Sequence, residues 1–240
     1  MGSVRIGTAG WSIARAEAGR FPAEGSGLER YAAVFGAAEI NSSFHRPHRA
    51  STWERWRDTV PQDFRFSVKV PKWITHESKL ADCDEALATF LGEAGALSEK
   101  LAVLLVQLPP KLAFDPQVAA RFFESLSRMS PALVACEPRH TSWFEAEADA
   151  LLESLRVARV AADPARHAGA DQPGGWRGLS YWRLHGSPVI YRSSYTDRIA
   201  GYAALRAEAE AGRETWCIFD NTASSAATGD ALALCDALGT

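Results

Sequence analysis

The run LAVLLVQL at Leu101–Leu108 carries the pattern that decides the fold, an apolar strand that ends in a polar side chain, here Gln107. Short runs rich in Val, Ile and Leu predict strands. Seven further runs of this kind lie at Val4–Gly10, Ala37–Phe44, Phe66–Val70, Leu133–Arg139, Val157–Asp163, Leu179–Gly186 and Thr215–Asn221. The sequence therefore predicts eight strands.

Helical periodicity fills most of the intervals between these strands. The predicted helices are Leu28–Phe35, Ser51–Asp58, Asp84–Leu97, Pro116–Arg128, Glu145–Leu155, Arg198–Ala211 and Ala223–Leu238. Asp115 and Asp197 precede two of them as N-caps. Strands that alternate with helices build a parallel sheet, and 240 residues is close to the usual length of an α/β barrel. We expect one domain over residues 1–240, a single (β/α)8 barrel of the TIM type.

Two connections depart from this regular alternation. Pro164–Gly178, after the sixth strand, is rich in Pro and Gly and has no helical pattern, so a loop is the alternative to a sixth helix there. Ser12–Gly27, after the first strand, is also long and irregular. Long loops in compact domains are often functional, and we expect both of these at the same mouth of the barrel.

Composition narrows the classes of function. A net charge of -3 and a pI near 6.1 give no global basic field of the kind typical of nucleic-acid binders. No apolar run is long enough to span a bilayer, and the amino terminus enters a strand at Val4 without the apolar core of a secretory signal. We therefore expect a cytoplasmic protein with no membrane partner. The oligomeric state does not follow from the sequence.

The strand ends gather opposite charges. Three basic and four acidic side chains fall there: Lys69, Arg139 and Arg183, and Glu39, Glu137, Asp163 and Asp220. In an α/β barrel the site lies at the carboxyl ends of the strands. Opposed charges and partial burial push pKa values apart, which is what acid/base chemistry uses. The alternative is a self-satisfied layer of ion pairs that only stabilises the barrel.

Single residues of this set leave alternatives open. Lys69 is a candidate for a Schiff base, for acid/base chemistry or for anion binding, and equally a structural partner of Glu39 or Glu137. His185 precedes Gly186, which would let a ligand approach closely, so it ranks above the other histidines. Because residues two apart on a strand share a face, we expect Asn41 and Ser43 to point the same way as Glu39. His76 and His140 are candidate proton shuttles or ordinary loop histidines.

The sequence gives little support for a bound metal or cofactor. Glu39, Glu137, Asp163, His185 and Asp220 are conceivable metal ligands, but no local ligand motif is present and the neighbouring basic residues compete for the carboxylates. Gly7–Gly10 matches neither the Rossmann nor the Walker spacing. The sequence thus indicates no cofactor, and we expect no metal.

Several strand-end motifs occur together and in order. They are Gly7–Ser12, Glu39–Phe44, Phe66–Pro71 with Thr75-His76, Gln107–Pro110, Glu137–His140 with Ser142-Trp143, Tyr181–Gly186 and Phe219–Thr222. The chain resembles the YecE-like family, a domain of unknown function, family 72. The resemblance implies a barrel similar to those of sugar isomerases and apurinic endonucleases, with these strand ends as a shared pocket. His45 and Asp230 depart from the Tyr and Asn that the resemblance leads us to expect.

Our main hypothesis is an enzyme, a hydrolase, lyase or isomerase, that acts on a small phosphorylated or carboxylated ligand without a metal. The predicted catalytic residues are Lys69, Glu137, Asp163, His185 and Asp220. The predicted substrate-binding residues are Asn41, His76, Gln107, Arg139, His140, Trp143, Tyr181, Arg183 and Asn221.

Two alternatives come from other classes of function. The first is a nucleic-acid binding or phosphodiester-processing protein, suggested by the barrel and by aromatic residues at the mouth. It needs a basic rim, for which the candidates are Arg15, Arg20, Arg46, His48, Arg49, Lys72, Lys79, Arg177, Arg192 and Arg198. The second is a barrel that binds a ligand without turning it over.

Overall fold

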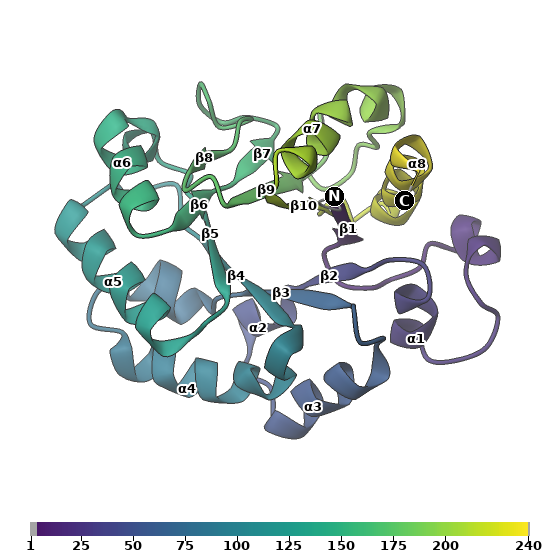
Figure 1. The fold of residues 1–240 in the computed structure, drawn as a ribbon, viewed down its shortest axis with the longest axis horizontal. Coiled ribbons are helices and arrows are strands. Elements are labelled where there is room, and N and C mark those ends of the chain that lie inside the picture. Colours follow the sequence, from purple (N-terminus) through teal and green to yellow (C-terminus); the bar gives the residue numbers. More distant parts are fainter. Residues whose placement is uncertain (1–3, 240) are drawn as a thin grey trace.

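The computed structural model describes residues 4–239, with strands at the centre and helices around them (Figure 1). All eight predicted strands are present, in two sheets. The first sheet is parallel and has the order β1 (Val4–Thr8), β10 (Glu214–Phe219), β9 (Leu179–Leu184), β7 (Ala161–Asp163). The second has the order β2 (Ala37–Ile40), β3 (Arg65–Lys69), β4 (Leu101–Gln107), β5 (Leu133–Glu137), β6 (Val157–Arg159), β8 (Gly174–Gly175), with only β8 antiparallel.

The two sheets approach each other at two places. β6 and β7 are the two halves of the predicted sixth strand, separated by Val160, and each half pairs in a different sheet. On the other side a parallel bridge joins Ala9 to Glu39, and the Gly10 amide donates to the Glu39 carbonyl at 2.8 Å. The fold is a mixed α/β fold built on two sheets, in place of the single continuous sheet that the sequence predicts.

The predicted helices are present, with small shifts at their ends. They are α1 (Gly27–Ala32), α3 (Ala50–Thr59), α4 (Asp84–Ala94), α5 (Pro116–Met129), α6 (Ala146–Ser154), α7 (Ala204–Glu210) and α8 (Ala226–Leu238). The Asp115 N-cap is confirmed, because its carboxylate accepts from the amides of Gln117 and Val118. The Asp197 N-cap is wrong: that residue lies inside the 3-10 segment η5 (Thr196–Ala203), which precedes α7.

The long connections behave as the sequence predicts. Pro164–Gly178 contains no helix and only the two-residue strand β8. Arg159 on β6 holds this loop against α6, since its guanidinium donates to the Gly169 carbonyl at 3.0 Å and to Asp149 on α6 at 3.0 Å. Ser12–Gly27 contains the 3-10 segment η1 (Arg15–Arg20).

Short helical turns follow three strands directly, and the sequence did not predict them. They are α2 (Ser42–His45), η2 (Trp73–Glu77) and η4 (Thr141–Phe144); a further turn, η3 (Gly95–Lys100), continues α4. The predicted strand Ala37–Phe44 therefore stops at Ile40, and Asn41 and Ser43 do not share a strand face with Glu39. The Ser43 hydroxyl fixes this turn by donating to the Lys69 carbonyl on β3 at 2.7 Å.

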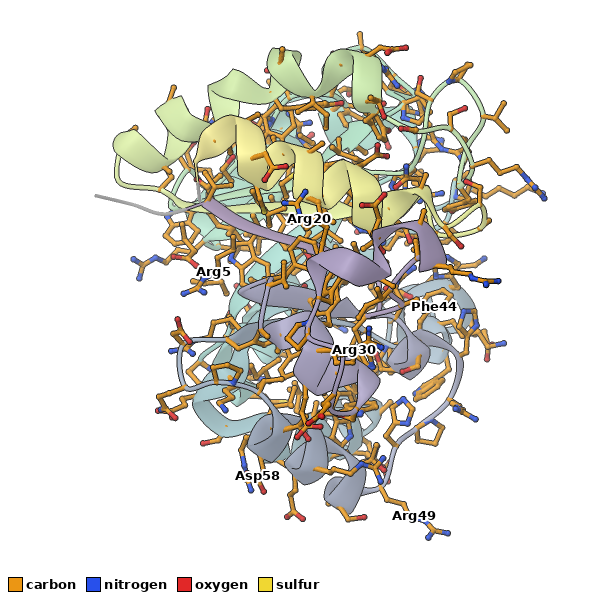
Figure 2. The ribbon with its side chains drawn as sticks, turned by 90° about the vertical axis from the view of Figure 1, so that its right-hand side faces the viewer. Arg5, Arg20, Arg30, Phe44, Arg49 and Asp58 are labelled. Atoms are coloured by element: carbon orange, nitrogen blue, oxygen red, sulfur yellow. The ribbon has the colours of Figure 1, made fainter. Side chains whose placement is uncertain are left out.

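Apolar side chains fill the inside of the strand layer below the polar ends. Leu105, Tyr181, Trp216 and Ile218 are all buried there, and the rings of Tyr181 and Trp216 stack. In Figure 2, Arg5 near the start of β1 and Phe44 just beyond the end of β2 lie on opposite sides of the molecule. The strands therefore begin on one side and end on the other, and we call the side of their carboxyl ends the mouth. Within residues 4–239, no helix combines the length and apolar character needed to cross a membrane.

Candidate functional site

Arg183 on β9 lies at the centre of the mouth, with its side chain fully buried. Its guanidinium donates to three carboxylates: to Glu39 at 3.0 and 2.6 Å, to Glu137 at 2.5 Å and to Asp220 at 3.0 Å. Burial alone would lower the pKa of Arg183, but these carboxylates outweigh it and raise that pKa well above its usual value. Arg183 is thus a permanent internal cation, and each of its three nitrogens donates to a carboxylate.

Two carboxylates of this central cluster, those of Glu137 and Asp220, remain ionised. Burial disfavours the charge on Glu137, but Arg183, His185 and Arg139 outweigh it, so the pKa of Glu137 lies well below its usual value. Arg139 contributes two hydrogen bonds to Glu137, at 3.0 and 2.7 Å. The pKa of Asp220 is lowered in the same way, against burial, chiefly by Arg183. Together these charges form a buried network of ion pairs.

Tyr181 and Ser67 form the floor beneath this network. The Tyr181 hydroxyl donates to Glu39 at 2.9 Å, and its oxygen lies 2.7 Å from the Ser67 hydroxyl. Burial and the Glu39 charge hold the pKa of Tyr181 well above its usual value. Tyr181 therefore stays neutral and serves as a hydrogen-bond donor to the cluster.

His185, just beyond β9, has one engaged and one unengaged ring nitrogen. Nδ1 lies 3.0 Å from an Asp220 oxygen. Nε2 lies 3.3 Å from a Glu137 oxygen, close enough for an ion pair when the ring is protonated, but its alignment gives no hydrogen bond for this buried nitrogen. Burial lowers the pKa of His185, yet Glu137 and the Asp220 hydrogen bond outweigh it, so the pKa is raised. Nε2 is thus positioned to give or take a proton.

Lys69, at the end of β3, is 8 % exposed and has no ion pair or hydrogen bond from Nζ to any residue that the structure describes. Its ammonium lies over the Phe44 ring, 4.1 Å from the ring centre. Burial lowers the pKa of Lys69 to about 8, and the Arg183 charge acts in the same direction. This amine is partly neutral in the physiological pH range.

A small cavity opens beside His185. Its volume is about 20 Å³, roughly the space of one water molecule. Its lining is Glu137, Pro138, Arg139, Ala162, Pro164, Arg166, Ala170, His185, Ile190 and Tyr191. Two arginines, a histidine and a tyrosine therefore surround this space together with apolar atoms. Arg166 was not among the predicted site residues, and its only signal was its place in the Pro/Gly-rich loop.

Three predicted binding residues also have polar atoms available at the mouth. The Asn41 side-chain oxygen is buried and has no partner. Gln107 is 8 % exposed, and no partner for its amide is found among the described residues. His76 lies on η2, with Nδ1 2.9 Å from the Thr75 hydroxyl and its ring against Phe44. Burial, followed by the charges of Lys69 and Arg139, lowers the pKa of His76.

The other predicted residues make their main contacts outside the central cluster. Asp163 accepts from the Tyr195 hydroxyl at 2.6 Å. His140 caps η4 by accepting from the Ser142 amide. Trp143 is buried and donates to the Leu112 carbonyl at 3.0 Å, and Asn221 donates to the Ser193 carbonyl and to Asp230. These contacts are structural, and any role in ligand binding stays a prediction.

Asp230, one of the two departures from the resemblance, lies behind Asn221 and makes no ion pair among the described residues. It is buried and accepts from the Ser194 hydroxyl at 2.6 Å, the Tyr195 amide at 3.0 Å and the Asn221 amide at 2.6 Å. This neutral set of donors ties the segment before η5 to α8. His45, the other departure, is exposed and its ring contacts Phe44.

The sequence analysis also raised a metal site and a basic rim around the mouth. Among residues 4–239, no group of three or more His, Cys, Asp and Glu side chains is arranged to hold a metal ion. Several predicted rim cations are engaged: Arg20 pairs with Asp236 at 2.9 Å, Lys72 with Glu77 at 3.2 Å and Arg198 with Asp163 at 3.6 Å. The rim thus has less unpaired positive charge than the sequence suggests.

Comparison with known proteins gives relatives in bacteria. The chain is similar to YecE of Escherichia coli strain K12, with 29% identity over 118 residues, 49% of this chain and 43% of YecE. It is similar to YunF of Bacillus subtilis strain 168, with 28% identity over 123 residues, 49% of this chain and 44% of YunF. The matched part therefore spans less than half the length of these curated relatives.

Solved structures share the fold. A DUF72 family protein of Enterococcus faecalis V583 has a TM-score of 0.83 at 20% identity, over 99% of this chain and 96% of that one. One from Thermotoga maritima MSB8 has a TM-score of 0.77 at 23% identity, over 99% of both chains. A xylose isomerase-like TIM barrel/4-hydroxyphenylpyruvate dioxygenase fusion protein reaches 0.51 at 13% identity, over 98% of this chain and 41% of that one.

The mixed α/β fold is thus similar to that of a xylose isomerase-like TIM barrel protein, and the YecE-like resemblance of the strand-end motifs is confirmed. The family described as "Protein of unknown function DUF72" matches residues 5–240, nearly the whole chain. On that match, the chain belongs to the DUF72 family.

Proposed function

We propose that this protein is an enzyme that uses acid/base chemistry at the mouth on a small phosphorylated or carboxylated substrate. The observation that carries the proposal is His185, whose Nδ1 is held by Asp220 while its buried Nε2, 3.3 Å from a Glu137 oxygen, makes no hydrogen bond. A buried polar atom without a partner costs free energy, so its retention is typical of a position that meets a ligand. The reaction class is a hydrolase, lyase or isomerase.

The charges around the small cavity support an anionic substrate. Arg139 directs Nε and Nη2 at Glu137, which leaves Nη1 for a ligand, and Arg166 lines the same cavity from the Pro164–Gly178 loop. Two guanidinium groups suit a phosphate or a carboxylate. Arg183 is a poor candidate for direct contact, because its donors face three carboxylates. In this proposal Arg183 fixes the catalytic groups and Arg139 and Arg166 hold the anion.

We also propose that the two sheets close into one (β/α)8 barrel. The bridge between Ala9 and Glu39 supports closure on one side. The direct succession of β6 and β7, in different sheets, supports it on the other. A closed barrel would bring the ends of β2, β5, β9 and β10 to one point, where Arg183 meets its three carboxylates.

The test begins with ligand binding. Wild-type protein is screened by thermal shift against a panel of small sugar phosphates and carboxylic acids, and the compounds that stabilise it are titrated by calorimetry. We expect Arg139→Gln and Arg166→Gln to weaken binding at least tenfold, and the matched control Arg177→Gln, an exposed arginine of the same loop, to leave it unchanged. Equal affinity in all three variants would count against the anion site.

Turnover of those ligands then tests the chemistry. His185→Asn keeps an N–H group that can reach Asp220 but lacks Nε2, so binding should persist while turnover falls by a hundredfold or more, about the scale of general acid/base catalysis. A ligand that binds with Arg139 dependence but is never turned over would favour the alternative of a non-catalytic binding barrel.

A further inference from the structure

Lys69 differs from Arg183 and Arg139 because no carboxylate is paired with it among the described residues. Arg183 and Arg139 bind both oxygens of Glu39 and Glu137 and one oxygen of Asp220. Lys69 is nearly as buried as they are, yet Nζ faces the Phe44 ring at 4.1 Å. A lysine that served only to balance charge would be expected to lie against one of these carboxylates. Among the residues that the structure describes, the geometry therefore leaves the Lys69 amine without an anionic partner and with only the Phe44 ring against it.

The surroundings of Lys69 fulfil both conditions that activate a lysine nucleophile. Such lysines are desolvated, or lie next to another cation, or both. Burial is the largest influence on Lys69, and the permanent charge of Arg183 is the next. Glu137, Glu39 and Asp220 oppose these effects, but the pKa still falls to about 8. A substantial share of Lys69 is then a neutral amine at slightly alkaline pH.

We infer that Lys69 forms an imine with a small aldehyde or ketone that also carries a phosphate or a carboxylate. The inference rests on the proposed function for the anionic group and adds the carbonyl as the reacting group. After the ammonium gives one proton to a base, the amine lone pair attacks the carbonyl carbon, a C–N bond forms, and a proton moves from the nitrogen to the oxygen. The base then returns its proton to that oxygen, which leaves as water, so one ammonium and one carbonyl yield one protonated imine and one water.

His76 provides a base beside this reaction. Its ring contacts Phe44, the same ring that lies under Lys69, with centroids 5.1 Å apart. Nδ1 faces the Thr75 hydroxyl, and Nε2 has no hydrogen bond within the described part of the chain. Because burial and the Lys69 and Arg139 charges lower the pKa of His76, its imidazole is neutral near pH 7 and can accept the proton that Lys69 loses.

The experiment is reductive trapping on the full chain. The protein is incubated separately with pyruvate, glycolaldehyde phosphate and dihydroxyacetone phosphate in the presence of cyanoborohydride, digested, and mapped by mass spectrometry. We expect at least one probe to give a single reduced adduct at Lys69, formed faster as the pH rises through about 8. Lys69→Arg should abolish the adduct, and Lys72→Arg, an exposed lysine paired with Glu77, should retain it.

Adducts spread over exposed lysines and unchanged in Lys69→Arg, or no adduct at Lys69 with any of the three probes, would overturn the inference. Mapping on the wild-type protein gives this answer even if a variant folds poorly. The anion-binding titrations with Arg139→Gln and Arg166→Gln separate the two proposals. Arginine-dependent binding without an imine rejects only the covalent step, whereas loss of both rejects the proposed function as well.

Discussion

Two buried lysines, Lys69 at the mouth and Lys100 at the end of η3, have nearly equal exposure, 8 % and 7 %. Lys100 donates to the carbonyls of Arg57 and Val60 at 2.7 and 2.6 Å, so it caps α3. Lys69 has no such partner among the described residues and lies over an aromatic ring. Burial lowers the pKa of both lysines.

The difference between these lysines teaches where to look for function. A buried cation that donates to carboxylates or carbonyls is compensated for its lost hydration, and Arg183, with four such bonds, is the extreme case. Lys69 has only the Phe44 ring among the described residues, so its lost hydration is compensated less. Our proposals assign a ligand to this position and to two buried atoms that lack a hydrogen bond, the His185 Nε2 and the Asn41 oxygen.

The largest effect should come from Arg183→Met. It leaves Glu39, Glu137 and Asp220 buried together without their shared cation, which should lower the free energy of unfolding by about 3–5 kcal/mol in urea denaturation. Without the cation the carboxylates would bind protons more tightly in the folded state, so the loss should shrink as the pH falls.

The exposed pair of Arg20 and Asp236 provides the control for this change. Arg20→Met removes an arginine from a surface ion pair and should leave stability nearly unchanged. A similar small loss for Arg183→Met would mean that the buried network does not hold the mouth together.

Replacing each of the two lysines by Met should change the free energy of unfolding in opposite directions. Lys100→Met removes a donor from two carbonyls and should cost about 2–3 kcal/mol at pH 7. Lys69→Met removes a desolvated charge and should raise stability at pH 7, by up to about 3 kcal/mol for a pKa lowered from 10.5 to about 8. Urea denaturation of both variants measures this contrast directly.

The pH dependence gives the control for Lys69. Between about pH 8 and 10.5 the unfolded chain holds a proton on Lys69 that the folded chain has released, so wild-type stability rises with pH in that window relative to Lys69→Met. The gap between the two proteins should close by pH 10.5. A constant gap would show that the amine is not strained by burial.

A smaller effect is expected from His185, with the opposite sign. Its pKa is raised in the folded protein above the ordinary 6.5. The protonated ring therefore contributes stability that is fully present below pH 6.5 and is lost as the pH rises through the folded pKa. Wild type should exceed His185→Asn in stability by more at pH 5.5 than at pH 9. A gap that grows with pH would contradict this assignment of the His185 charge.

The smallest effect should come from Asp230→Asn, which restores the residue that the family resemblance leads us to expect. Asp230 accepts from neutral donors only, and an Asn oxygen can keep the bonds from the Tyr195 and Asn221 amides. The free energy of unfolding should change by no more than about 1 kcal/mol, which a measurement of the melting temperature can check. Ligand binding at the mouth should be unaffected, and a marked change would show that this network reaches the site.

Much of the fold followed from the sequence because the strands are apolar and end in polar residues. The Pro164–Gly178 loop was also predictable, since Pro and Gly break helical periodicity. The short turns after the strands were not, because contacts distant in sequence hold them. The turn that contains Ser43 depends on the Lys69 carbonyl, 26 residues away.

The sequence predicts which residues form the candidate site but not which of them contact one another. Strand-end position places Glu39, Glu137 and Arg183 near one another, whatever the loops do. Which oxygen meets which nitrogen depends on side-chain geometry across four strands. Asp163 faces Tyr195 because the segment after β9 folds back on it, and Arg166 reaches the cavity because Arg159 holds its loop. Neither arrangement leaves a pattern in the sequence.

The buried guanidinium of Arg183 should make the structure of the mouth insensitive to salt and to chelators. Its plane and fixed angles hold carboxylates from three other strands at set distances, much as a bound ion would. Unlike an ion, it is covalently attached to β9, so neither dialysis nor a chelator can remove it. Because it is sealed from water, dissolved salt screens it far less than it screens exposed charges. The mouth should keep its shape in brine and in dilute buffer alike.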